Sequence, residues 1–326
     1  MKNIINIFTV IATVIMFTAC NNKNELSSNT PELTKEQKFA KLNYQIAEYN
    51  SMFMLQYPKQ TNMQKGSWKQ FWKVAKADIQ GAAAGAAAGS AIGGAIGVIG
   101  GGTAAPGAAI GGAIGALAGG ITYSVNEVLN PTTTSGTGNG STSASISEHN
   151  YWLYNEIGDY EHLVELEKFD TSMYSVEDNI GCFHNFIIEQ MFKDNPDILK
   201  ISTDELFNSV IEYMKIYFPI KMKNFDVERL KEQVLFNLKY DLPILNTEDD
   251  PFPFLSENYP DLKNEIAVIG DYVNTVSRLD PELQPAYSAG IVSLIKGSDL
   301  EPLSSLIIIS AISVGINSSS LWIETE

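Results

Sequence analysis

The chain has 326 residues, of which 44% are hydrophobic and 18% are charged, and its formal net charge is −16. This composition excludes a chain that is disordered throughout, and a total of two cysteines excludes a disulfide framework. Residues 148–326 hold 12 Lys or Arg against 32 Asp or Glu, a net of −20, whereas residues 1–147 have a net of +4. The acidic C-terminal part, with only two arginines in the chain, argues against nucleic acid as a partner.

The N-terminus has the pattern of a secretory signal peptide. Lys2 precedes an apolar run that ends at Phe17, and small residues stand directly before Cys20. A cysteine in this place resembles a bacterial lipobox. The resemblance implies that residues 1–19 are removed and that Cys20 is acylated, and the absence of Asp after it implies the outer membrane. The alternative is a buried N-terminal helix with an incidental cysteine, but the residues that follow Cys20 are polar.

Residues 20–66 are predicted to form a lipid-anchored tether and an amphipathic helix. Residues 21–30 have no apolar period, whereas Thr34 and Gln37 form a capping box at the start of a helix that ends before Pro58. Core packing of its apolar face is the simplest role, with a coiled coil as the alternative. The face consists of Phe39, Leu42, Ile46, Tyr49 and Phe53.

The 48 residues from Ile79 to Asn126 contain no charged side chain, and glycines recur among them at intervals of four. This spacing aligns glycines on one face of a helix, where another backbone can approach closely. A Gly/Pro break at 102–106 separates two such series, which predicts a helical hairpin within residues 67–130. The predicted helix-packing glycines are Gly81, Gly85, Gly89, Gly93, Gly97, Gly101, Gly107, Gly111, Gly115 and Gly119.

This pattern resembles a glycine zipper, and its combination with a lipobox is similar to glycine-zipper outer-membrane lipoproteins. The resemblance implies no catalytic residue. Six glycines in one arm cost roughly 6 kcal/mol relative to alanine, so the arm must pack against its twin, against another molecule or within a bilayer. Arms of about 20 residues can span roughly 30 Å of hydrocarbon, although few of their residues are strongly apolar. A low-complexity disordered linker is the third alternative.

Lysines and aromatic residues precede the glycines. Lysine stems and tryptophan rings beside an uncharged hairpin are typical of a membrane interface or of an amphipathic helix on anionic lipid. A soluble helix with its tryptophans in the core is the alternative. The predicted membrane-interface residues are Lys65, Trp68, Lys69, Phe71, Trp72 and Lys73.

Residues 131–147 are rich in Thr, Ser and Gly and are predicted to be a flexible polar linker. Residues 148–326 show helical periodicity in nearly every segment, with a second capping box at Ser202 and Glu205. The apolar stretch 306–316 is too short to span a membrane and predicts a central core helix. The predicted fold class is therefore mainly α, with a glycine-zipper helical hairpin joined by a polar linker to an acidic all-α domain.

Few residues suggest chemistry. A mononuclear zinc site from His162, Glu165 and His184 can be constructed, but hydrogen-bonded or surface histidines explain the same residues. The motifs of serine hydrolases, phosphate-binding loops, metalloproteases and kinases are absent from the sequence. Cys182 is predicted to be a buried apolar thiol. No catalytic residue, metal or cofactor is predicted.

The sequence therefore favours a non-enzymatic, lipid-anchored cell-envelope protein whose hairpin associates with membrane or with itself. Its predicted partners are membrane lipid, through acylated Cys20 and the hairpin, and a second copy of the chain. The alternative is a bacteriocin-like, membrane-perturbing protein, because glycine-ladder bacteriocins have a similar hairpin. The third hypothesis is the metal-dependent enzyme.

Overall fold

The computed structural model describes residues 33–57, 67–99, 104–129, 144–146, 180–195, 197–247, 250–280 and 283–324. In these residues the protein is mainly α, which confirms the predicted fold class. The elements in chain order are α2 (Lys35–Gln56), α3 (Ser67–Ile99), α4 (Ala104–Leu129), β1 (Ala144–Ile146), α5 (Ile180–Asp194), η3 (Ile198–Lys200), α6 (Thr203–Tyr217), α7 (Pro219–Met222), α8 (Val227–Thr247), α9 (Phe252–Asn258), η4 (Pro260–Leu262), α10 (Lys263–Val276), α11 (Gln284–Lys296), α12 (Pro302–Leu321) and β2 (Trp322–Glu324).

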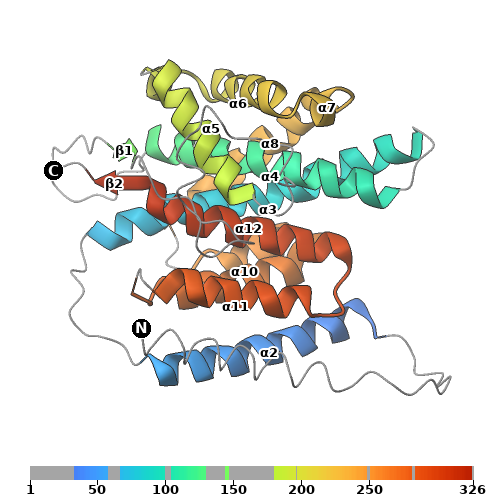
Figure 1. Cartoon of the computed structure of the whole chain (residues 1–326), viewed down its shortest axis with the longest axis vertical. Coiled ribbons are helices and arrows are strands. Elements are labelled where there is room, and N and C mark those ends of the chain that lie inside the picture. Colours follow the sequence, from blue (N-terminus) through green and yellow to red (C-terminus); the bar gives the residue numbers. More distant parts are fainter. Residues whose placement is uncertain are drawn as a thin grey trace.

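The helices α3 and α4 form an antiparallel hairpin that runs through the middle of the molecule (Figure 1). Helix α12 packs against both arms, and α5, α6 and α8 contact the hairpin from other sides. Helices α10 and α11 pack against α12, and α2 lies outermost, against α10 and α11. The hairpin is thus covered by helices that come from much later in the chain.

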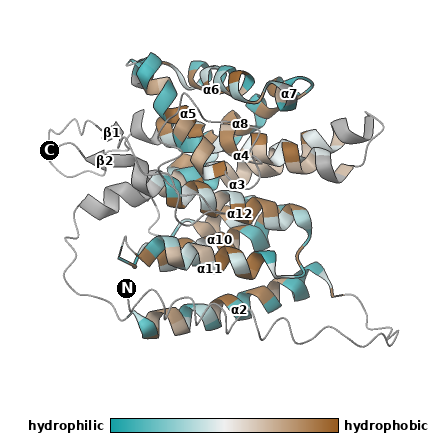
Figure 2. Ribbon diagram, viewed as in Figure 1, coloured by the Kyte–Doolittle hydropathy of each residue, from teal (hydrophilic) through white to brown (hydrophobic). Residues whose placement is uncertain are grey.

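One hydrophobic core joins the hairpin to the C-terminal helices. Ile79 and Leu117 of the hairpin belong to the same buried cluster as Phe183 of α5 and Ile312 of α12. Figure 2 shows hydrophilic residues on the outer helices α2, α6 and α7, and hydrophobic residues along α12 and α10. The predicted segments 67–130 and 148–326 therefore share one core in space, although they are separate in composition.

Helix α12 is the central core helix that the sequence predicted. From residue 307 to residue 318 its side chains are buried all round, including Ile308, Ala311, Ile312 and Val314. A helix that is apolar on every face must be covered on every face. It meets this need by packing against α3, α4, α5, α10 and α11.

The two capping boxes that the sequence predicted are confirmed. Thr34 caps α2 and Ser202 caps α6, each with a complete capping box. Asp226 precedes α8, and its Oδ1 accepts a hydrogen bond from the backbone N–H of Arg229 at 3.1 Å. Such caps are local in sequence, because the cap satisfies backbone groups only three residues away.

Two features differ from the sequence prediction. Helix α3 runs without a break from Ser67 into the glycine series, so the Trp/Lys segment and the first arm are one helix of 33 residues. Three residues of the predicted linker form β1, which pairs antiparallel with β2 and aligns Ala144 with Glu324. A strand of three residues is too short to show an alternating pattern, so sequence reasoning had no signal for it.

Candidate functional site: the glycine-packed hairpin

The two arms of the hairpin meet through paired glycines, which we call the glycine seam. A Cβ atom built on Gly85 would lie closer than 3.0 Å to the carbonyl oxygen of Gly115, a distance that real Cβ atoms essentially never show. The same holds for Gly89 against the carbonyl oxygen of Gly111. Because the obstacle is backbone, it cannot move aside as a flexible side chain would. Even alanine therefore clashes at this seam. The facing pairs are Gly81–Gly119, Gly85–Gly115, Gly89–Gly111 and Gly93–Gly107.

A second set of glycines receives side chains from the covering helices. A Cβ on Gly120 of α4 would lie 3.2 Å from Cδ2 of His184 and 3.3 Å from Cγ1 of Val314. In the opposite direction, Gly315 of α12 receives the side chain of Ile79. The hairpin and α12 therefore interlock, with side chains of each filling spaces that glycines leave in the other.

A cluster of polar side chains is buried where α3, α5 and α12 meet. Asp78 and His184 are both 0% exposed, and His184 Nε2 lies 3.9 Å from Asp78 Oδ2. Ser318 donates a hydrogen bond to the same carboxylate oxygen. Burial lowers the pKa of His184 to about 4, and the nearby Asn185 side chain and Gly120 backbone oppose this effect only in part. At neutral pH the imidazole is therefore uncharged.

A second buried carboxylate ties the hairpin to α8. Asp241 accepts hydrogen bonds from Tyr259 at 2.7 Å, from Tyr123 of α4 at 2.8 Å and from Gln80 of α3 at 3.3 Å. Burial raises the pKa of Asp241, although the three donors oppose this effect. Burial and the neighbouring Asp241 also raise the pKa of Tyr123 well above its usual value. This carboxylate thus bridges both arms of the hairpin to a covering helix.

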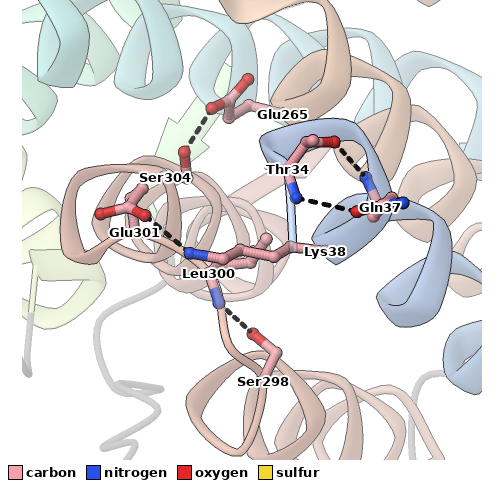
Figure 3. A network of polar contacts seen from close by, with 8 residues as sticks. All are labelled: Thr34, Gln37, Lys38, Glu265, Ser298, Leu300, Glu301 and Ser304. Atoms are coloured by element: carbon pink, nitrogen blue, oxygen red, sulfur yellow. Dashed lines mark hydrogen bonds and ion pairs between the residues drawn. The ribbon is translucent and has the colours of Figure 1, made fainter. Parts of the chain in front are cut away.

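Helix α2 is held on the outside by lysines that meet acidic residues of the C-terminal helices. Lys38 Nζ lies 2.9 Å from Glu301 Oε1, and Lys35 Nζ lies 2.9 Å from Glu265 Oε1. Figure 3 shows Lys38 reaching from the capped start of α2 toward Glu301, and Ser304 donating to the buried Glu265. These contacts join the segment nearest the predicted lipid anchor to the helices that pack around α12.

The structure brings together some of the predicted residues and leaves others undescribed. The seam contains the eight predicted glycines whose surroundings the structure describes; the surroundings of Gly97 and Gly101 lie outside the described part of the chain. Cys20 and Lys65 also lie outside them, and the five other predicted membrane-interface residues belong to the first turns of α3.

The predicted zinc site is not tested as a whole, because His162 and Glu165 lie outside the described residues. Its third member, His184, lies in the buried cluster with Asp78. No group of three or more His, Cys, Asp or Glu side chains is placed to hold a metal ion within the described part of the chain. Cys182 is a buried free thiol whose pKa is raised by burial.

Sequence reasoning missed the buried polar residues at the base of the hairpin. Asp78 is the charged residue directly before the uncharged stretch that begins at Ile79. Gln80 is the second residue of that stretch. A lone acid beside 48 uncharged residues is a signal that it is buried with the apolar segment. Nothing in the sequence indicated that His184, more than a hundred residues later, would face it.

One described segment, Gly107–Asn126 of α4, is long and apolar enough to cross a membrane, and 83% of its most apolar window is buried inside the protein. A core helix passes the same test of length and composition. Length and composition alone therefore do not distinguish a membrane span from a core helix, and in the structure this segment is part of the core.

Comparison with known proteins gives no further guide. No protein-family model, curated protein or solved structure matches the chain.

Proposed function

We propose that the protein is a non-enzymatic, lipid-anchored component of the bacterial cell envelope that carries a glycine-zipper hairpin. The observation that carries this proposal is the glycine seam, covered by helices from the same chain. Arms with so many glycines cannot be stable as isolated helices in water. The covering by α5, α8 and α12 supplies the packing that they need. Such a protein could keep a membrane-compatible hairpin in an aqueous compartment.

The anchor in this proposal is acylated Cys20, and the location is the outer membrane. A second contact with lipid would strengthen the attachment that acylated Cys20 gives. The hairpin and the Trp/Lys turns at the start of α3 would provide that contact. A second copy of the chain is the other proposed partner; because the glycine faces of the two arms pack against each other in the folded chain, this contact requires the arms to separate.

The anchor is tested by expressing the full chain and its Cys20→Ser variant in a bacterial host with labelled palmitate. The proposal predicts label and membrane fractionation for the natural chain, and neither label nor signal-peptide cleavage at residue 19 for the variant. A natural chain that is unlabelled and fully soluble would contradict the anchor. Protease treatment of intact cells then separates the surface face of the outer membrane from the periplasmic face.

A bacteriocin-like, membrane-perturbing protein is the second candidate, and one observation favours it. The segment Gly107–Asn126 is long enough to span a bilayer, yet it is covered in the folded protein. A hairpin that is delivered to a target membrane needs such covering before release. Full-length Cys20→Ser protein added to dye-loaded vesicles tests this role. Dye release by the folded protein would favour this role, and intact vesicles at high protein load would exclude it.

A further inference from the structure

Two titratable side chains face each other where the hairpin meets its covering helices. Asp78 comes from α3 and His184 from α5, and Ser318 of α12 donates to the same Asp78 oxygen that faces the imidazole. All three residues are 0% exposed. A change of charge at this point therefore acts on three elements at once and cannot be screened by water.

The hydrogen bonds around His184 decide which ring nitrogen takes up a proton. Asn185 Nδ2 donates to the backbone carbonyl of Asn317 at 2.9 Å, which fixes the orientation of the Asn185 amide. Its Oδ1 then lies 3.0 Å from His184 Nδ1. Because an amide oxygen only accepts, Nδ1 carries the proton of the neutral ring. Nε2, which has no hydrogen bond within the described residues, is the atom that gains a proton in acid.

We propose that Asp78, His184 and Ser318 form an acid-sensitive latch, in which protonation of His184 Nε2 loosens the packing of α5 and α12 on the base of the hairpin. The added proton would face Asp78 Oδ2 at 3.9 Å, beyond hydrogen-bond distance, and this oxygen already accepts from Ser318. Desolvation of the imidazolium then outweighs its attraction to the carboxylate. The consequence is a hairpin that is uncovered more often in mildly acidic medium than at neutral pH.

The other groups around His184 do not replace it as the sensor. From α12 the neighbouring polar residues are Ser313, Asn317 and Ser318, which do not titrate in this range, and α4 presents Gly120. Cys182 and Glu189 are buried on α5 itself. Burial raises the pKa of the thiol, so it stays protonated, and a pH effect that came from Glu189 would persist in a His184→Gln variant. Asp78 is the titratable group on α3 that faces the ring.

The sign and size of the effect follow from the pKa of His184. The folded value is about 4, and the ordinary value that the ring regains when the latch opens is 6.5. The open state therefore binds the proton more tightly, and acid favours opening as pH falls from 6.5 toward 4. Linkage then predicts that the equilibrium constant for opening rises about 30-fold between pH 7.5 and pH 5. The raised pKa of Asp241 acts in the opposite direction, which makes a variant comparison necessary.

Hydrogen exchange of the full-length Cys20→Ser protein at pH 7.5 and pH 5 tests the latch, after correction for the intrinsic pH dependence of exchange. We expect α5, α12 and residues 77–90 and 111–126 to open about 30-fold more often at pH 5, with a much smaller change in α2. His184→Gln keeps a hydrogen-bonding side chain that does not titrate, and should reduce the change to less than about threefold. His149→Gln and His162→Gln are the matched controls and should retain it.

Three results would overturn the latch. They are equal or greater protection of α5 and α12 at pH 5, an unchanged pH effect in His184→Gln, or loss of the pH effect in either control. If His184→Gln does not fold, the histidine resonances of the unsubstituted ring decide the matter by NMR. One of the three histidine rings, that of His184, must stay neutral down to pH 5. Three histidine rings that all titrate near the ordinary pKa would refute the proposal.

This inference rests on the proposed function only in its last step, the binding of the exposed hairpin to a membrane. Vesicles of phosphatidylethanolamine and phosphatidylglycerol, mixed with the same protein at both pH values, separate the two. Opening at pH 5 without vesicle binding would leave the latch standing and remove the membrane role of the hairpin. Vesicle binding at both pH values, with no opening at pH 5, would remove the latch and leave the membrane role.

Discussion

The two ends of the hairpin have the same glycine spacing but different surroundings. At the base, residues 77–86, 88–90 and 111–126 are buried, whereas near the turn Ala91, Ala95 and Ala104 are exposed. Figure 1 shows the turn end of α3 and α4 reaching past the ends of the helices beside it. Glycine spacing therefore accounts for the pairing of the arms, and the C-terminal helices account for their burial. These two properties can be changed separately.

Replacing a glycine of the seam should destabilise the protein most at the base of the hairpin. Gly89→Leu puts a side chain against the carbonyl of Gly111, in a region that the covering helices hold closed. The gain in helix propensity, about 1 kcal/mol, is smaller than the loss from forcing two backbones apart. We expect a loss of about 3 kcal/mol or more in the free energy of unfolding, or no soluble protein. Urea denaturation, monitored by circular dichroism, measures this loss in the free energy of unfolding. A loss below about 1 kcal/mol would mean that the seam can open at little cost.

The turn end should tolerate the same substitution better. Gly93→Leu meets the backbone of Gly107, but its neighbour Ala95 is exposed, so the arms can splay apart there. We expect a loss of about 1–3 kcal/mol, below that of Gly89→Leu, in the same urea experiment. Ala91→Leu, an exposed position away from the seam, is the control and should stay within about 0.5 kcal/mol.

Equal effects of Gly93→Leu and Ala91→Leu would show that the four-residue spacing is compositional. Equal effects of Gly93→Leu and Gly89→Leu would show instead that the arms pair tightly along their whole length. In that case the base and the turn end would differ only in how far their residues are exposed to solvent.

The base differs from the turn end in its polar contacts as well. Tyr259→Phe removes the 2.7 Å hydrogen bond to Asp241, the carboxylate that also binds both arms of the hairpin. We expect a loss of about 1–2 kcal/mol at neutral pH. The loss should shrink in acid, because a protonated carboxyl group needs fewer donors, and each donor lowers the pKa of Asp241. Thermal unfolding at several pH values tests this, with the exposed Tyr240→Phe on α8 as control. A loss that grows in acid would contradict the assigned role of the donor.

The sequence predicted what depends on near neighbours. The capping boxes at Thr34 and Ser202 involve residues three apart, and the glycine series shows its period within each arm. The pairing of Gly85 with Gly115 depends also on the length of the turn, which periodicity does not give. The contact between Asp78 and His184 depends on how distant helices pack. Long-range packing of this kind leaves no trace in the spacing of one segment, so the covering of the hairpin and its buried polar cluster emerged only in three dimensions.

The smallest effect is expected far from the hairpin, at the surface of α2. Lys41 Nζ lies 2.7 Å from Asp299 Oδ2, and both side chains are more than half exposed. The hydrogen bond from Lys41 lowers the pKa of Asp299, but water and salt screen such a pair. Lys41→Gln should therefore change the free energy of unfolding by less than about 0.5 kcal/mol, and by less still in high salt. Urea denaturation at low and high salt measures it. A loss comparable to that of Gly93→Leu would mean that the docking of α2 stabilises the core around the hairpin. Helix α2 would then have to be counted among the helices that cover the hairpin.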